Sequence, residues 1–170
     1  MIIVGLDPGR CGGMALWCDG KMECFSFKNK DEYEIAKQFD ILSCCGARAF
    51  LEKVHAAPGQ GVASMFTFGQ GYGFLRGLLV AHKIPFEDVS PQTWQKEMRI
   101  PNRGNKTKSE HKNLLKQRAK QLYPSNEDIN LETADALLIA QYGLQTINGV
   151  QKMKQLRAKP SGGFTVEMDI

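Results

Sequence analysis

Three short apolar runs separated by turn residues open the sequence, and they constrain the fold more than any other feature. Residues 2–6 read IIVGL and are followed at once by Asp-Pro-Gly, a combination that ends a strand. Residues 12–17 and 21–27 are two further runs joined by Cys-Asp-Gly, and Asp-Gly between apolar runs is a strong hairpin signal. The sequence therefore predicts three antiparallel strands, of which the first ends at Asp7.

Strand and helix patterns alternate after this opening. Two short apolar segments, residues 47–54 and 84–89, predict a fourth and a fifth strand. Amphipathic or helix-length segments predict helices over residues 31–43, 61–81, 91–98, 107–122 and 130–147. Helices that follow an antiparallel opening and alternate with strands indicate an α/β fold, in which a mixed five-stranded sheet is flanked by helices.

The helix predicted over residues 61–81 contains three glycines at four-residue spacing, Gly69, Gly73 and Gly77. Each glycine within a helix costs about 1 kcal/mol relative to alanine. Residues four apart share a helix face, so the three glycines form a line. We expect another element to approach this line closely, as a helix-packing or dimer face.

Length and composition indicate one domain. A chain of 170 residues with 42% hydrophobic composition can bury a sizeable core but is short for two ordinary domains. We assign residues 1–148 to the domain and residues 149–170 to a basic C-terminal tail. No apolar run approaches the roughly 18 residues of a membrane span, and no signal-peptide pattern opens the chain, so we expect a cytoplasmic protein. Five cysteines without CxxC or Cys/His spacing predict reduced, buried thiols.

Positive charge is concentrated in the last third of the chain, although the net charge is only +4. Between residues 103 and 120 the single acid Glu110 is outnumbered by Arg103, Lys106, Lys108, Lys112, Lys116, Arg118 and Lys120. A second basic run follows the last apolar segment, at Lys152, Lys154, Arg157 and Lys159. This asymmetry is typical of a protein that binds a polyanion.

Four lysines recur every four residues in the helix predicted over residues 107–122, at Lys108, Lys112, Lys116 and Lys120. We expect them to form a basic stripe opposite the apolar residues Leu115, Ala119 and Leu122. Such a stripe would contact phosphates and position a nucleic acid without reading its sequence. A solvated helix face is the alternative, and the stripe alone does not decide between them.

Four carboxylates in apolar surroundings are the candidate chemical centre. Asp7 ends a buried strand, and Glu52 lies within the apolar segment ARAFLEKV. Glu132 and Asp135 are three residues apart at the start of the last predicted helix, so we expect them to share a face. A buried charge is costly unless it is compensated, and one or two divalent cations would neutralise the four acids.

The residue types indicate which cation. Oxygen ligands select hard ions such as Mg²⁺ or Mn²⁺. Two such ions roughly 3.5–4 Å apart support phosphodiester hydrolysis. The alternatives are that Glu52 faces solvent on an edge strand and that the two later acids favour a helix N-terminus. These alternatives explain the four acids together less well, because Asp135 is too far into an apolar helix for capping alone.

Several segments, in this order, resemble the RuvC-type Holliday junction resolvases of the ribonuclease H-like superfamily, including those of phages and large DNA viruses. They are IVGLDPGRCGGMAL, LEKVHAAPGQG, the helix with glycines and aromatics after it, VSPQTWQK and ADALLIA, and they extend over most of residues 1–147. The resemblance implies a ribonuclease H-like fold and a homodimeric endonuclease that acts with Mg²⁺ or Mn²⁺ on DNA recombination, repair or replication intermediates. Its substrate would be four-way DNA junctions and, as in some members, other branched DNA.

The resemblance also implies roles for individual residues. Asp7, Glu52 and Asp135 match the family's catalytic, metal-binding acids, and Glu132 stands where the family commonly has an aspartate. Catalysis-assisting lysines and a junction-wedging aromatic are expected near the loop over residues 100–106 and in the helix after Glu52. We therefore assign DNA contact to Arg103, Lys106, Lys108, Lys112, Lys116, Phe66 and Phe68.

Two other classes of function remain open. One is a branched-DNA-binding protein with a disabled site, which the retention of four acids disfavours. The other is an actin-like ATPase, because that superfamily also opens with a strand, an aspartate and a glycine-containing hairpin. Such an ATPase normally needs a second phosphate loop and a far longer chain.

Overall fold

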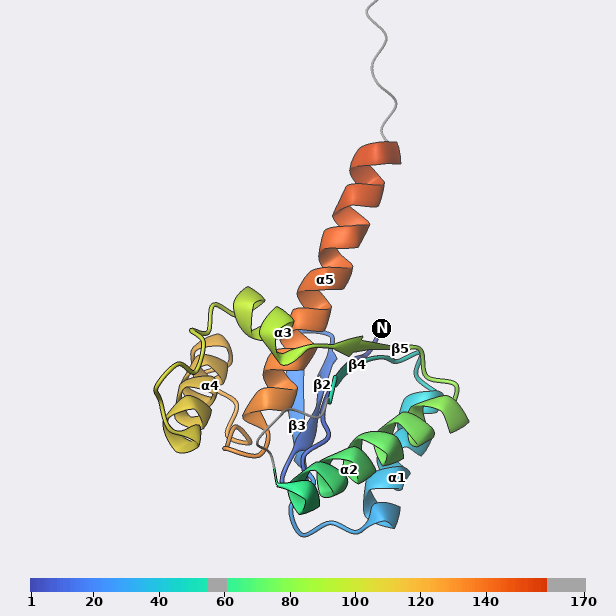
Figure 1. The fold of residues 1–170 in the computed structure, drawn as a ribbon. Coiled ribbons are helices and arrows are strands. Elements are labelled where there is room, and N and C mark those ends of the chain that lie inside the picture. Colours follow the sequence, from blue (N-terminus) through green and yellow to red (C-terminus); the bar gives the residue numbers. More distant parts are fainter. Residues whose placement is uncertain (55–60, 159–170) are drawn as a thin grey trace, which may run out of the picture.

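A computed structural model describes residues 1–54 and 61–158, and only the backbone over residues 153–158. Its centre is a sheet with the strand order β3-β2-β1-β4-β5. The strands are β1 (Ile3–Asp7), β2 (Gly13–Cys18), β3 (Lys21–Ser26), β4 (Arg48–Glu52) and β5 (Phe86–Val89). The first three pair antiparallel, whereas β4 runs parallel to β1 and β5 parallel to β4. The predicted mixed five-stranded sheet is confirmed (Figure 1).

Five helices of the described residues connect and cover the strands. They are α1 (Glu32–Ser43), α2 (Val62–Ala81), α3 (Pro91–Glu97), α4 (Lys108–Leu122) and α5 (Ala134–Ala158). The start of α4 has the predicted capping box, in which Thr107 and Glu110 each bind the other's backbone N–H. Ser90 caps α3 and accepts from the N–H of Thr93, with Pro91 at the first helical position as predicted.

The helices form a layer on each face of the sheet (Figure 1). Val4 and Leu6 of β1 lie in the hydrophobic cluster that includes the buried side chains of α1 and α2. Ile3 belongs to the opposite cluster, with residues of α3, α4 and α5. Successive side chains of a strand point to opposite faces, so Asp7 shares the α5 face with Ile3.

Glycine at position 5 lets α5 lie directly against β1. A Cβ atom on Gly5 would overlap the backbone of Ala136 and Ala140 in α5. Farther along α5, Gly143 leaves the space that the ring of Phe50 fills from β4. This close packing brings the first turn of α5, which contains Asp135, to the end of β1.

The last helix differs from its predicted bounds of 130–147 at both ends. Residues 130–133 form a turn in which the side chain of Asn130 accepts from the N–H of Glu132, so the helix begins only at Ala134. At the other end α5 continues through Gly149 to Ala158 and extends beyond the sheet (Figure 1). A glycine costs a helix about 1 kcal/mol but does not by itself end it. The predicted tail is therefore helical as far as residue 158, and residues 159–170 lie outside the described chain.

All five cysteines lie in the described chain and have free thiols. Their predicted burial is wrong, because Cys11, Cys44 and Cys45 are exposed and Cys18 and Cys24 are only partly buried. Over residues 1–54 and 61–158, no helix combines the length and the apolarity that crossing a bilayer requires.

Candidate active site

Asp7 and Glu52 lie side by side because their strands are parallel neighbours. Leu6 of β1 is in register with Leu51 of β4, and the next residue of each strand is the carboxylate. Both carboxylates therefore lie at the carboxyl-terminal ends of adjacent parallel strands, on the face that α5 covers. Asp7 is 4% exposed, and the backbone N–H of Gly9 donates to its Oδ1 at 3.0 Å.

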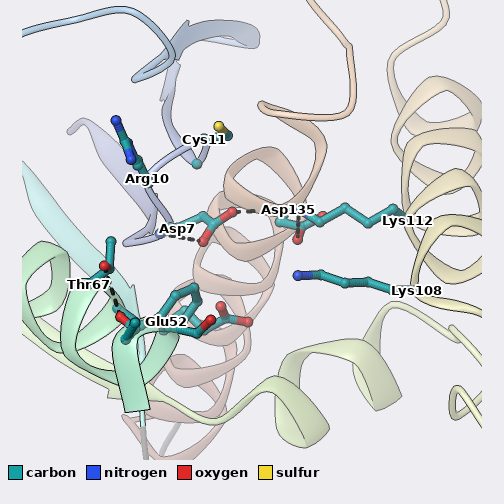
Figure 2. Close-up of a pocket in the computed structure, with 13 residues that line it drawn as sticks. Asp7, Arg10, Cys11, Glu52, Thr67, Lys108, Lys112 and Asp135 are labelled. Carbon is teal, nitrogen blue, oxygen red and sulfur yellow. Dashed lines mark hydrogen bonds and ion pairs between the residues drawn. The ribbon is translucent and has the colours of Figure 1, made fainter. Parts of the chain in front are cut away.

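Asp135 completes a group of three acids from three separate elements. It is the second residue of α5, is 7% exposed and lies opposite the end of β1. Asp7, Glu52 and Asp135 line one cavity (Figure 2). Its other walls come from the loop after β1, the first turns of α2 and the start of α4, at Gly9, Arg10, Cys11, Gly12, Ala63, Ser64, Thr67, Phe68, Lys108 and Lys112.

Lys112 points into this cavity. Its Nζ lies 2.9 Å from Oδ2 of Asp135 and 3.9 Å from Oδ2 of Asp7. The prediction that the lysine stripe lies opposite the apolar face of α4 is wrong for this residue. Lys112 and Ala119 are seven residues apart, close to two full helical turns, so they point in nearly the same direction. Ala119 is fully buried, and Lys112 extends from the same side of the helix toward the carboxylates.

Trp94 fixes the orientation of Glu52. The sequence predicts Trp94 as a core residue, and it is indeed fully buried. In addition, its indole Nε1–H donates to Oε1 of Glu52 at 3.1 Å. A buried indole N–H normally needs a hydrogen-bond acceptor, and here the acceptor is the half-buried carboxylate of Glu52. Sequence spacing could not identify this partner, because 42 residues separate the two.

Burial and mutual repulsion of the carboxylates determine the pKa values in the cavity. Burial raises the pKa of Asp7 to about 6, and repulsion from Asp135 adds to the rise. Burial, with repulsion from Asp7 and Asp135, raises the pKa of Glu52 to about 8. Desolvation lowers the pKa of Lys112, but the neighbouring carboxylates outweigh it and the net direction is upward. The arrangement favours an additional cation.

A hard divalent ion fits the donor chemistry of this cavity. Oδ1 of Asp135 is buried and, among the described residues, has no hydrogen-bond partner. Carboxylate oxygens are the ligands that Mg²⁺ and Mn²⁺ prefer. Within the described chain, however, no three His, Cys, Asp or Glu side chains are spaced as one ion's ligands. The ammonium group of Lys112 lies between Asp7 and Asp135 instead.

Glu132 is not brought into this group. Its Oε1 accepts from Nζ of Lys28 at 3.1 Å, and it does not line the cavity. The hydrogen bond from Lys28 holds the pKa of Glu132 below its usual value. The expected shared helix face with Asp135 is wrong, because Glu132 belongs to the turn before α5. A catalytic role for Glu132 stays a prediction.

The residues assigned to DNA contact are found in three places. Lys108, like Lys112, lines the cavity, and so does Phe68. Arg103 and Lys106 do not line it but are exposed on the tight turn before α4, where Arg103 Nε donates to the carbonyl oxygen of Lys106 at 3.0 Å. Phe66 is 66% exposed and does not line the cavity, and Lys116 lies one turn beyond Lys112 on α4.

The strand order and the two helical layers define a class of fold, the ribonuclease H-like α/β fold. Among solved structures the chain is similar to Thermus thermophilus RuvC, with 15% identity, 88% of this chain and 97% of that chain covered, and a TM-score of 0.59. It is also similar to T. thermophilus RuvC in complex with Holliday junction substrate, with 12% identity, coverage of 88% and 96%, and a TM-score of 0.60. No family model matches the sequence, and no curated protein matches it. The chain therefore has a RuvC-like fold.

Proposed function

We propose that this chain is a metal-dependent endonuclease that hydrolyses phosphodiester bonds in four-way DNA junctions and other branched DNA. The observation that supports this most directly is the convergence of Asp7, Glu52 and Asp135 from three elements in one cavity beside two lysines. The RuvC-like fold supports the substrate class, because one similar structure is a complex with a Holliday junction.

The three carboxylates would hold Mg²⁺ or Mn²⁺, as two ions in the arrangement common to phosphodiester-cleaving sites. Bound ions would stabilise the negative charge that develops on the reacting phosphate. The chain's own groups orient the ligands: the N–H of Gly9 holds one oxygen of Asp7, and the indole of Trp94 holds one oxygen of Glu52. The ammonium groups of Lys108 and Lys112 would pair with phosphate oxygens at the cavity.

The DNA backbone would run from the cavity along the start of α4. Lys108 is the first residue of α4, and Arg103 and Lys106 are exposed on the turn before it. Contacts of this kind position DNA by its phosphates, so selectivity for branched DNA would come from shape. Phe68, at the cavity wall, would stack on a base exposed at the branch point.

We further propose a homodimer that forms through α2. At 100° per residue, six positions of this helix fall within an arc of about 80°: Val62, Phe66, Gly69, Gly73, Gly77 and Val80. We call this line the α2 stripe. Three of its members are exposed by 80%, 66% and 63%, namely Val62, Phe66 and Val80, and a Cβ on any of its glycines would meet nothing within 4 Å.

A second copy of the chain is the occupant that the α2 stripe favours. The stripe spans about 27 Å and points away from the cavity, so two copies could pack α2 against α2 and leave both cavities open. Glycines allow the two helix backbones to approach closely, while the exposed Val and Phe side chains supply apolar area. Two cavities on one particle would allow paired nicks at a junction. In this arrangement Phe66 belongs to the dimer contact rather than to the DNA.

One experiment tests the nuclease activity. Purified protein is incubated with labelled four-way junctions, forks and linear duplexes in Mg²⁺, Mn²⁺ or EDTA. We expect metal-dependent cleavage of the branched substrates. Asp7→Asn should bind junctions with near-normal affinity but not cut them, whereas Asp40→Asn, at an exposed aspartate of α1, should cut normally.

The other outcomes have clear meanings. Junction binding without cleavage in any metal would favour the disabled, DNA-binding protein over the nuclease. Absence of both binding and cleavage would reject the proposal as a whole.

A further inference from the structure

The ammonium group of Lys112 is placed where a cation shared by two carboxylates would be. Its Nζ is 2.9 Å from Asp135 and 3.9 Å from Asp7, in each case from the Oδ2 atom. The two carboxylate side chains are 10% and 6% exposed, whereas the lysine side chain, which enters from α4, is 30% exposed. Lys112 therefore reaches from the open side of the cavity to its buried acids.

Lys108 provides an internal comparison. It lies one turn earlier on the same helix and lines the same cavity. Within the described chain it makes no ion pair with a carboxylate, in contrast to Lys112. The two lysines thus have the same charge and nearly the same location, but only Lys112 is in contact with the acids.

We propose that Lys112 is a tethered cation that competes with the divalent ion for Asp7 and Asp135 and must withdraw before the ion binds. This inference rests on the proposed metal-dependent function. Lys112 opposes ion binding in the DNA-free protein, whereas a lysine that only contacts phosphate would not.

The competition follows from the sizes and charges involved. Mg²⁺ binds carboxylate oxygens at roughly 2.0–2.1 Å, closer than the lysine Nζ lies to either acid, so an ion held by Asp7 and Asp135 would compete with the ammonium for the same carboxylate oxygens. The two cations would also repel each other strongly in a poorly hydrated cavity. Lysine has a flexible four-carbon stem, so its ammonium can swing toward the mouth of the cavity without a movement of α4.

Withdrawal gives Lys112 two alternative partners. Without the ion, its ammonium compensates the two buried acids. With the ion bound, the same ammonium is free to pair with a phosphate at the mouth of the cavity. A DNA phosphate would therefore favour the withdrawn position, so ion binding and DNA binding should assist each other.

The test measures ion binding in the absence of DNA. Mn²⁺ is titrated by calorimetry into the wild-type protein, Lys112→Gln and Lys108→Gln. Removal of a competing ion pair should tighten Mn²⁺ binding by Lys112→Gln about tenfold. The matched control Lys108→Gln loses the same charge from the same cavity and should tighten binding only about twofold, through the general field.

Two further measurements guard against a folding artefact. Lys112→Arg keeps a cation at the same helix position and should retain wild-type Mn²⁺ affinity. In thermal unfolding, Lys112→Gln should be less stable than wild type in EDTA, because its buried acids lack a partner, and should gain more from Mn²⁺ than wild type does. The fluorescence of Trp94, which contacts Glu52, offers a second signal for the same titration.

The outcomes separate the two proposals. Unchanged or weaker Mn²⁺ binding by Lys112→Gln, or equal tightening by both glutamine variants, would overturn the role of Lys112 alone. A lack of Mn²⁺ binding by all three proteins would overturn the metal-dependent function as well.

Discussion

A tryptophan hydrogen bond and a lysine from a neighbouring helix hold the carboxylates of the site in an apolar interior. Each contact joins two different elements. Trp94 of α3 donates to Glu52 of β4, and Lys112 of α4 donates to Asp135 of α5. A buried acid that keeps a raised pKa is poised to exchange its proton for a metal ion. Repulsion between the ionised carboxylates of the site is therefore unfavourable, and a bound ion would neutralise it.

The raised pKa values predict how stability depends on pH when no metal is present. The pKa of Glu52 is about 8 against an ordinary value of 4.5, and that of Asp7 is about 6 against 3.8. Protonation of these two carboxyl groups stabilises the folded state. The stabilisation is complete below their ordinary pKa values and is lost as pH rises through their raised pKa values in the folded state. In EDTA, the free energy of unfolding should therefore fall between about pH 5 and pH 8 by on the order of 3–5 kcal/mol, at about 1.4 kcal/mol for each pKa unit.

Chemical denaturation across this pH range measures the effect. Glu52→Gln removes the group with the larger rise and should show a clearly shallower decline than wild type. Equal slopes for the two proteins would contradict the raised pKa of Glu52.

At the scale of elements, α5 decides where the acids meet. It lies against β1 over Gly5, and its first turn places Asp135 opposite Asp7. The start of the helix is equally decisive, because a start at Ala134 leaves Glu132 in the preceding turn, where it pairs with Lys28. A helix that began four residues earlier would have placed both acids on one face.

Gly5→Ala tests the contact between α5 and β1. The added methyl group would overlap the backbone of Ala136 and force the helix outward, which should cost about 1–3 kcal/mol of unfolding free energy or more. Gly149→Ala is the matched control, because Gly149 lies exposed in the same helix with nothing within 4 Å of a Cβ. That variant should be stabilised by up to about 1 kcal/mol. Urea unfolding of both proteins measures the difference, and a neutral Gly5→Ala would refute the role given to this contact.

Gly73→Leu tests the dimer proposed through the α2 stripe. A leucine at the centre of the stripe would hold two α2 helices apart, while a single copy has open space there. We expect light scattering to report a dimer for wild type and a monomer for Gly73→Leu at micromolar concentration. Tyr33→Ala, which alters an 82% exposed aromatic on α1, should stay dimeric. A monomeric wild type would contradict the proposal directly.

At the scale of the whole molecule, the two helical layers present surfaces of different chemistry. Helices α3, α4 and α5 form one layer and α2 belongs to the other (Figure 1). Helix α4 carries the lysines that line the cavity, and α2 carries the apolar stripe. DNA and a second copy of the chain would thus approach different sides of α2. The separation lets each surface be changed without damage to the other.

This division predicts a specific salt dependence for junction binding. In the Asp7→Asn background, Lys106→Gln and Lys116→Gln should each weaken junction binding. Each should also reduce the magnitude of the slope of log K against log salt by about 1, because each removes a phosphate contact. Lys37→Gln, at an exposed lysine of α1 on the opposite layer, should leave the slope unchanged. Fluorescence anisotropy with a labelled four-way junction measures these slopes. If Lys37→Gln and the α4 variants had equal effects, the assigned DNA path would be wrong.

The sequence by itself determined the features that depend on neighbours along the chain. Alternating apolar residues and Asp-Gly turns are local signals, so the strands, the hairpin and the capping box at Thr107 could be predicted. The end of β1 at Asp7 follows from the same signals. The sequence predicts the fourth strand over residues 47–54, with Glu52 inside it, whereas β4 ends at Glu52 and so places this acid beside Asp7.

Only the tertiary structure decided which groups from distant segments meet. The side chain of Lys112 could face solvent or the core until α4 was placed against α5, and its contact with Asp135 depends on that placement. Glu132 lies two residues before the start of α5, in the preceding turn. There its carboxylate accepts a hydrogen bond from Lys28 and does not face the predicted site. The physical reason is that strand and helix periodicity act over a few residues, whereas the position of a buried charge depends on the packing of whole elements.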